Sequence, residues 1–325
     1  MEQEHSHIFG PVPSRRLGYS LGVDILPLKT CNLNCVYCEL GRTNRETNRR
    51  KAWVGADVIL PEIEQAVKNT GRIDFITFSG SGEPTLNTEL GTMIRAIKKM
   101  TTIPVAVITN GTLLWLPEVR NDVAEADLVL PSLDAASRVA FKKINRPHGT
   151  LELEKIIDGL VAFRREYNGP IWLEILLARG FNDSPEEIDA LVQAVRRIEP
   201  DKVQLNTVVR PPAEADIKPL SHAELVALQR KFGDRAEVIA HFEAGRQKNQ
   251  SQDVEAEVCA LCARRPVTLD EIVTSLGFTK DEVDRAIAAL VFDGRLAALP
   301  HGRKVYYTVP RDRAREVFPQ DYFAE

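Results

Sequence analysis

Short apolar runs and amphipathic segments alternate along the first two thirds of the chain. The apolar runs predict β-strands, and the segments with apolar residues at helical spacing predict helices. We expect strands at residues 20–26, 74–78, 105–109, 128–133, 171–177 and 202–208. We expect helices at residues 61–69, 90–100, 117–125, 136–144, 151–167 and 185–198. This alternation predicts an α/β fold that is built on a parallel sheet.

The pattern changes towards the C-terminus. Residues 244–253 are polar and predict a linker. Three amphipathic patterns follow, and a hairpin-like segment comes after them, at residues 254–264, 269–276, 280–293 and 296–310. This order of elements resembles that of a winged-helix domain. We therefore expect two domains, residues 1–243 and residues 254–325, on either side of the linker.

Capping residues support several of the predicted helix starts. Thr268 with Glu271, and Thr279 with Glu282, show the spacing of a capping box, in which each side chain hydrogen-bonds the backbone amide of the other residue. Gly277 lies between these two helices, where the chain must turn. The starts of the last two predicted helices are therefore well defined.

Composition is that of an ordinary globular enzyme. The 325 residues are 44% hydrophobic and 27% charged, with a net charge of -4, so the chain as a whole is not a general nucleic-acid binder. No run approaches the roughly 18 apolar residues of a membrane span, and the N-terminus has no basic region followed by an apolar core. Five cysteines do not suggest a secreted disulfide framework. We expect a cytoplasmic protein that does not bind membranes.

Three of the cysteines lie close together, directly after an apolar run at residues 21–28. Cys31, Cys35 and Cys38 form a C-x3-C-x2-C pattern. Three local thiolates fill three corners of a [4Fe-4S] cluster and leave the fourth iron open for chemistry. A structural zinc site normally needs four ligands, and no Cys or His follows Cys38 until His148. Unrelated core cysteines are disfavoured, because Asn and Gly residues around them indicate a loop.

The segment CNLNCVYC resembles the signature of the radical S-adenosylmethionine (SAM) enzymes, in which an aromatic residue, here Tyr37, precedes the last cysteine. A second motif, SGSGEP at residues 79–84, resembles the family loop that meets the amino group of SAM. Its glycines permit close backbone approach to a ligand, and Glu83 supplies a carboxylate. The alternative for this glycine-rich loop, Ser79–Glu83, is a flexible strand-to-helix turn.

The resemblance implies a partial (β/α)6 barrel and two cofactors, a [4Fe-4S] cluster and SAM. It also implies that one electron, from a donor of the flavodoxin or ferredoxin type, cleaves SAM to a 5'-deoxyadenosyl radical that abstracts hydrogen from a substrate. The cluster ligands would be Cys31, Cys35 and Cys38.

Polar residues follow the predicted strands, whose carboxyl ends meet at one edge of a parallel sheet. By resemblance, Ser132 and Asp134 lie where related enzymes meet the cofactor, and Asn110 lies near the same rim. Arg179 can grip a carboxylate or phosphate, although surface ion pairing is the alternative. For the other residues of this kind the alternative is a cap or a turn. The expected cofactor-binding residues are Tyr37, Ser79, Gly80, Ser81, Gly82, Glu83, Asn110, Ser132, Asp134, Arg179 and Asn206.

A basic segment, residues 42–51, comes just after the cysteines. It holds four arginines and one lysine, and only Glu39 and Glu46 nearby oppose them. A solvated loop is the usual explanation of such a run. Its position near the expected site favours recruitment of an anionic substrate, such as a phosphate backbone.

The N-terminal segment FGPVPSRRLGYSLGVDILPLKTC resembles a branch that is filed beside the wyosine-synthesis enzymes, which modify guanosine in tRNA. The sequence departs from those enzymes because no cysteine precedes Cys31. We therefore keep three hypotheses open. The substrate is tRNA or another nucleotide, or the substrate is a peptide or protein held by the winged helix, or the chain is a non-catalytic iron-sulfur sensor. The glycine-rich loop disfavours the sensor.

The C-terminal domain carries two weaker signals. Its third predicted helix begins with acidic residues, which disfavours contact with DNA phosphates. Cys259 and Cys262 form a second C-x2-C pattern, which suits either an auxiliary cluster or two small core residues. We favour the core interpretation, because no further cysteine is left to complete a cluster.

Overall fold

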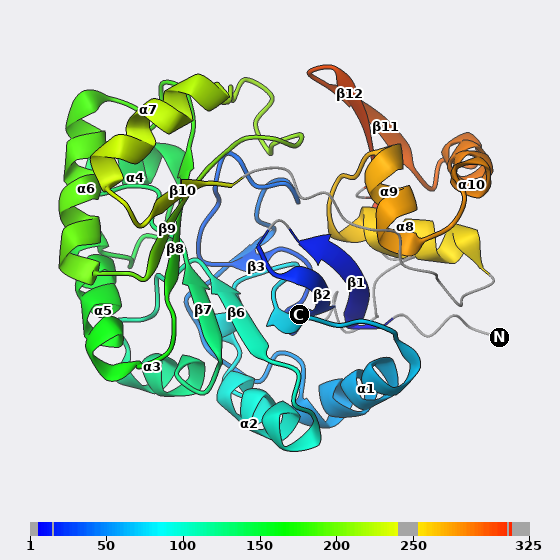
Figure 1. Ribbon diagram of the computed structural model, residues 1–325, viewed down its shortest axis with the longest axis horizontal. Coiled ribbons are helices and arrows are strands. Elements are labelled where there is room, and N and C mark those ends of the chain that lie inside the picture. The colour runs from blue at the N-terminus through cyan, green and yellow to red at the C-terminus, as the bar shows by residue number, and fades with distance from the viewer. Residues whose placement is uncertain (1–5, 15, 240–252, 311, 314–325) are drawn as a thin grey trace.

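The computed structural model describes residues 6–14, 16–239, 253–310 and 312–313 (Figure 1). The strands are β1 (Ile8–Ser14), β2 (Gly18–Val23), β3 (Thr30–Cys31), β4 (Arg45–Glu46), β5 (Phe75–Phe78), β6 (Val105–Thr109), β7 (Leu128–Pro131), β8 (Trp172–Leu177), β9 (Lys202–Thr207), β10 (Ala236–Val238), β11 (Ala297–His301) and β12 (Lys304–Thr308). The helices are α1 (Ala56–Asn69), α2 (Leu90–Met100), α3 (Pro117–Val123), α4 (Arg138–Ile144), α5 (Leu153–Glu166), α6 (Pro185–Ile198), α7 (His222–Phe232), α8 (Val254–Arg264), α9 (Leu269–Leu276) and α10 (Lys280–Phe292), with a short 3-10 helix at Pro84–Leu86.

The parallel strands follow one another in chain order. One sheet has the order β1-β2-β5-β6-β7 and a second has the order β10-β9-β8. Single bridges from β7 and Ser132 to Ile171 and Glu174 connect the two sheets. Helices α1, α2, α3, α5 and α6 lie along the outer side of this continuous curved sheet (Figure 1). The carboxyl ends of its strands therefore share one edge, as the alternation of elements predicts.

The predicted elements agree closely with the structure. Strand 105–109 and helices 90–100 and 185–198 match β6, α2 and α6 at both ends. Helix α1 begins at Ala56, five residues before the predicted start at Pro61. Proline usually marks the first turn of a helix, but here the exposed Pro61 lies inside the helix. Strands β1 and β10 and helix α7 were not predicted.

The residues 253–313 that the structure describes form the C-terminal module. Helices α8, α9 and α10 precede the antiparallel β11-β12 hairpin, in the predicted order. Both predicted capping boxes are present, and Gly277 adopts a left-handed φ of 72° at the end of α9. The predicted linker lies outside the described residues except for its last residue, Asp253.

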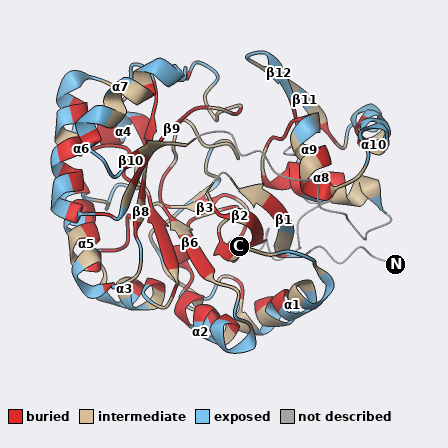
Figure 2. Ribbon diagram, viewed as in Figure 1, coloured by how far each residue is buried: buried red, intermediate tan, exposed pale blue. Residues whose placement is uncertain are grey.

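Two large hydrophobic cores and a small cluster around Leu17 and Leu130 hold the described residues together. The larger core fills the space between the curved sheet and its helices, and Figure 2 shows the buried residues on the inner faces of these helices. The smaller core belongs to the C-terminal module, yet it also contains Val12 of β1, with Phe9 packed against it. Strand β1 is therefore shared between the sheet and the module. No helix among the described residues is long and apolar enough to cross a membrane.

Candidate cluster and cofactor site

The cysteine loop, residues 31–38, begins in β3 at the carboxyl edge of the sheet. Each of its three sulfurs accepts a hydrogen bond. The Leu33 amide donates to Cys31 Sγ at 3.5 Å, Asn145 Nδ2 to Cys35 Sγ at 3.5 Å, and Lys29 Nζ to Cys38 Sγ at 3.0 Å. Donors of this kind stabilise sulfur that carries negative charge. The loop is therefore prepared to hold thiolates.

Burial favours the neutral thiol over the thiolate at two of these cysteines. It raises the pKa of Cys31 to about 12, with Glu83 contributing further, and it raises the pKa of Cys35 well above its usual value, with Asp134 contributing. A buried thiolate needs a nearby positive charge, which bound iron supplies. Among the described residues, no three His, Cys, Asp or Glu side chains are arranged to hold a single metal ion. Three thiols in one loop match the three protein ligands of a [4Fe-4S] cluster that leaves one iron open.

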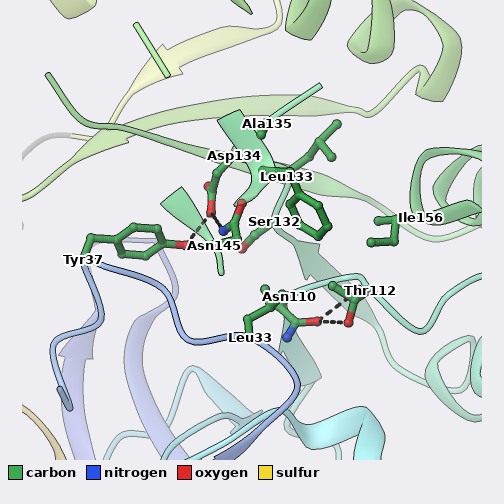
Figure 3. A pocket seen from close by; sticks show the side chains of 11 residues that line it. Leu33, Tyr37, Asn110, Thr112, Ser132, Leu133, Asp134, Ala135, Asn145 and Ile156 are labelled. Carbon is green, nitrogen blue, oxygen red and sulfur yellow. Dashed lines mark hydrogen bonds between the residues drawn. The ribbon is translucent and has the colours of Figure 1, made fainter. Parts of the chain in front are cut away.

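Asp134 anchors the cysteine loop. Its Oδ2 accepts hydrogen bonds from Tyr37 and from Asn145 Nδ2, and its Oδ1 accepts one from the Leu176 amide (Figure 3). Burial raises the pKa of Asp134 to about 6, although these hydrogen bonds oppose the shift. The neighbouring pocket has a volume of only about 20 Å³, which is room for about one water molecule. The contacts seen for Tyr37 and Asp134 thus fix the loop in place.

The glycine-rich loop, Ser79–Glu83, lies beside the cysteine loop. The Glu83 amide donates to the Thr30 carbonyl at 3.1 Å, next to Cys31. Glu83 Oε1 accepts hydrogen bonds from the Thr85 amide and hydroxyl and from the Thr109 hydroxyl, and Oε2 accepts one from the Asn110 amide at 2.7 Å. Burial raises the pKa of Glu83. Oε1 thus accepts three hydrogen bonds and Oε2 one, so Oε2 has the greater capacity for a further donor, such as an amino group.

Asn110 connects the two loops. Its Nδ2 lies 2.7 Å from Asn32 Oδ1 and 3.7 Å from Cys31 Sγ, while its backbone amide bonds Glu83. Asn110 and Ser132 both line the small pocket of Figure 3. The structure therefore brings the cysteines, Tyr37, the glycine-rich loop, Asn110, Ser132 and Asp134 together at one edge of the sheet.

A larger cavity, of about 300 Å³, lies on the other side of the glycine-rich loop. Cys38, Ser79 and Gly80 line one side of it, and Leu261 and Arg264 of α8 line another. Strands β2 and β5 contribute the hydroxyls of Ser20 and Thr77, which hydrogen-bond each other at 2.7 Å. This volume is at the small end of the range for ligand sites.

Two of the expected cofactor-binding residues, Arg179 and Asn206, line neither of these cavities. Arg179 donates to Glu224 of α7 at 2.7 Å, and both side chains are about half exposed. This ion pair raises the pKa of Arg179 and lowers that of Glu224 to about 2. Asn206 Nδ2 donates to Glu174 Oε1 at 2.8 Å, and Glu174 also accepts from Arg16, which lines the larger cavity. Arg179 lines neither cavity, so only Asn206 lies in a network that reaches one.

The basic segment is only partly available to a ligand. Arg50 bonds Asp122 at 2.6 Å and the Thr85 carbonyl at 2.8 Å, with its side chain 13% exposed. Lys51 lies over the Trp53 ring at 4.0 Å. Arg42 pairs with Glu214 but stays 62% exposed, and Arg49 is exposed. Arg50 and Lys51 thus have structural contacts that the charge pattern of the segment does not reveal.

Two important residues could not be found from the sequence. Asp24, at the end of β2, accepts hydrogen bonds from the Ser81 amide at 2.9 Å and from Arg264 Nη1 at 2.7 Å. Arg264 lies 240 positions along the chain from Asp24, so no local pattern links them.

Cys259 and Cys262 are buried in the apolar core of the C-terminal module, as the core interpretation of the second C-x2-C pattern expects.

A model of the radical SAM superfamily matches residues 25–192, which include the cysteine loop and the glycine-rich loop. The chain belongs to the radical SAM superfamily. It is a radical SAM enzyme, and the cofactors of the superfamily are a [4Fe-4S] cluster and SAM. The three thiols with their hydrogen-bond donors, together with the Glu83 carboxylate beside them, fit these two groups.

The chain is also similar to individual proteins along much of its length. A UPF0026 protein of Methanocaldococcus jannaschii is 34% identical over 306 residues, which cover 92% of this radical SAM chain and 94% of that protein. A Brachyspira hyodysenteriae protein named GTPase Obg is 38% identical over 292 residues, and the match covers 89% of this chain but only 43% of that longer protein. A solved radical SAM methyltransferase from Sphaerobacter thermophilus has a TM-score of 0.52 at 18% identity, over 67% of this chain and 66% of that one. That structural likeness concerns the fold alone.

Proposed function

We propose that this enzyme cleaves SAM reductively in a partial (β/α)6 barrel and abstracts hydrogen from tRNA or another nucleotide-containing substrate. The bound cluster and SAM supply a 5'-deoxyadenosyl radical, with an electron from a flavodoxin- or ferredoxin-type donor. The observation that supports this proposal most directly is that the glycine-rich loop lies beside the cysteines. The backbone amide of Glu83 donates a hydrogen bond to the Thr30 carbonyl, next to Cys31.

The residues of the chain have separate roles in this proposal. Glu83 Oε2 receives the amino end of SAM, and the Asn110 amide keeps this carboxylate oriented. Tyr37 and Asp134 hold the cysteine loop rigid. Ser132 and Asn206 would bind the rest of the cofactor, while the larger cavity would receive the reacting part of the substrate. The apolar Leu17, Leu40 and Ile108 in its lining help to keep water from a reactive radical.

The exposed part of the basic segment supports a nucleotide substrate. Arg42 and Arg49 follow Cys38 in the chain and are exposed, so they can contact a phosphate backbone. Such contacts release counterions, and binding then weakens steeply with salt.

The test is tRNA binding by Arg42→Ala/Arg49→Ala at several salt concentrations. We expect binding to weaken and its salt dependence to fall, since roughly one ion is released per phosphate contact. Arg95→Ala/Lys99→Ala on α2 removes the same charge elsewhere and serves as the control. Equal tRNA binding by the two double variants would reject a role for the basic segment.

A peptide or protein substrate is the second candidate. The arrangement of three helices and a hairpin in the C-terminal module supports it, because this order resembles a winged helix that can hold a polypeptide. Leu261 and Arg264 of this module line the larger cavity. Mass spectrometry of tRNA and of protein from cells with and without the enzyme separates the two candidates by showing which polymer gains the modification.

A further inference from the structure

A buried ion pair joins the C-terminal module to the curved sheet. Arg264, near the end of α8, donates from Nη1 to Asp24 Oδ2 at 2.7 Å and from Nη2 to the Ser6 carbonyl at 2.8 Å. The side chains of Arg264 and Asp24 are only 6% and 2% exposed. Both charges are withdrawn from water, so losing one partner leaves the other buried and uncompensated.

The same carboxylate holds the glycine-rich loop. Asp24 Oδ2 accepts from the Ser81 amide at 2.9 Å and from the Ser81 hydroxyl at 2.5 Å. Gly80 has a φ of 139°, and a Cβ atom there would collide with the Asp24 side chain. Arg264 therefore acts on the carboxylate against which the loop backbone packs.

Helix α8 also faces the larger cavity. Leu261 and Arg264 of this helix line it, as do Arg265, which follows the helix, and Cys38, Ser79 and Gly80. A second ion pair fixes the module in this position, because the buried Arg210, after β9, donates to the partly exposed Glu271 of α9 at 2.9 Å. The module thus has one attachment that reaches the glycine-rich loop and one that does not.

We propose that α8 of the C-terminal module forms a wall of the reaction chamber, and that Arg264 is a positioning residue that holds the glycine-rich loop through Asp24. This inference rests on the proposed function, because it assigns the loop to SAM and the cavity to the substrate. It makes the C-terminal module a part of the active site in addition to any role in recruiting a substrate.

Amide hydrogen exchange of the full-length, metal-free protein tests the mechanical part of this proposal. We expect Arg264→Gln to exchange about tenfold faster in residues 79–83, since a hydrogen bond to a charged group is lost. Arg264→Lys keeps the charge but cannot make both Nη contacts, so its exchange rate should lie between those of the other two proteins. The matched control is Glu271→Gln, which weakens the other ion pair and should leave loop exchange at the wild-type rate.

A second readout concerns SAM itself. In reconstituted protein we measure 5'-deoxyadenosine formation from SAM. We expect Arg264→Gln to raise the KM for SAM about tenfold with a smaller change in kcat, and we expect the KM of Arg264→Lys to lie between those of Arg264→Gln and the wild type. Glu271→Gln should keep the wild-type KM.

Two results would overturn the proposal. One is wild-type exchange in residues 79–83 for every folded Arg264 variant. The other is equally fast exchange in Glu271→Gln, which would mean that Arg264 only attaches the module. Because exchange is measured without the cofactors, it is informative even if the wild-type protein fails to cleave SAM, and that failure would count against the proposed function alone.

Discussion

Close packing at single residues sets the shape of the glycine-rich loop. A Cβ atom at Gly82 would collide with the Thr30 carbonyl, which is backbone and cannot move aside. A Cβ atom at Gly80 would collide with the Asp24 side chain, and Gly80 has a positive φ as well. Gly82 therefore serves close approach to the chain before Cys31, and Gly80 serves close approach to Asp24.

Replacement of Gly82 by Ala should push the loop away from Thr30. We expect a loss of about 2 kcal/mol in the free energy of unfolding, as for other overpacked sites, and weaker SAM binding. Urea denaturation and SAM titration measure the two effects. Gly149→Ala is the control, because nothing lies within 4 Å of a Cβ atom at Gly149. Wild-type stability and SAM affinity in Gly82→Ala would contradict the packing argument.

Arg50 should behave as a structural residue. Its guanidinium bonds Asp122 and the Thr85 carbonyl and is largely buried, so Arg50→Ala should lower the free energy of unfolding by about 1–3 kcal/mol. Arg49→Ala changes an exposed side chain and should stay within about 0.5 kcal/mol of the wild type. Chemical denaturation of both variants checks this, and equal stability would show that Arg50 is not part of the scaffold.

The sequence indicates residues that lie in local motifs, but it does not indicate residues that only tertiary folding brings together. Cys31, Cys35, Cys38 and Glu83 could be identified because their motifs are local. The anchor Asn145 and the pair of Asp24 with Arg264 could not, since tertiary folding alone brings these residues to the site. The charge pattern also could not separate the buried Arg50 from the exposed Arg49.

Chemical signals at helix ends allowed some helix starts to be predicted. Thr268 with Glu271, and Thr279 with Glu282, begin their helices as predicted. Strand β1 was missed, because its segment IFGPVPS contains two prolines and a glycine, which disfavour a strand. Its antiparallel pairing with β2 and its packing against the module compensate for this composition.

The capping box of α10 gives a prediction for one element. Thr279 accepts a hydrogen bond from the Glu282 amide, so Thr279→Ala should cost about 1 kcal/mol. Thr274→Ala makes the same chemical change inside α9 and should not destabilise, because Ala favours the helix interior. Thermal denaturation compares the two, and a Thr279→Ala protein as stable as Thr274→Ala would contradict the assigned cap.

The whole molecule depends on contacts between its two parts, which the polar linker pattern did not predict. The core of the C-terminal module includes Val12 of β1, and two ion pairs, of which Arg264–Asp24 is buried on both sides, cross the interface. The sequence gave no sign of this shared packing. The module is therefore expected to fold together with the sheet.

Removal of residues 244–325 tests this dependence. The remaining chain would expose Val12 and Phe9 and leave Asp24 without Arg264, so we expect a large loss of soluble protein and a broad, early thermal transition. A double substitution, Arg264→Gln/Glu271→Gln, keeps the module and should show an intermediate melting temperature. A truncated chain that melts cooperatively at the wild-type temperature would show that the sheet folds independently.

Radical chemistry itself is tested most directly by 5'-deoxyadenosine formation. The protein is reconstituted with iron and sulfide without oxygen, and dithionite and SAM are added, with Cys35→Ala as the control. We predict that 5'-deoxyadenosine forms with the wild-type protein only, because the variant lacks one cluster ligand. No 5'-deoxyadenosine from a wild-type protein that carries a complete [4Fe-4S] cluster would contradict reductive cleavage of SAM at this site.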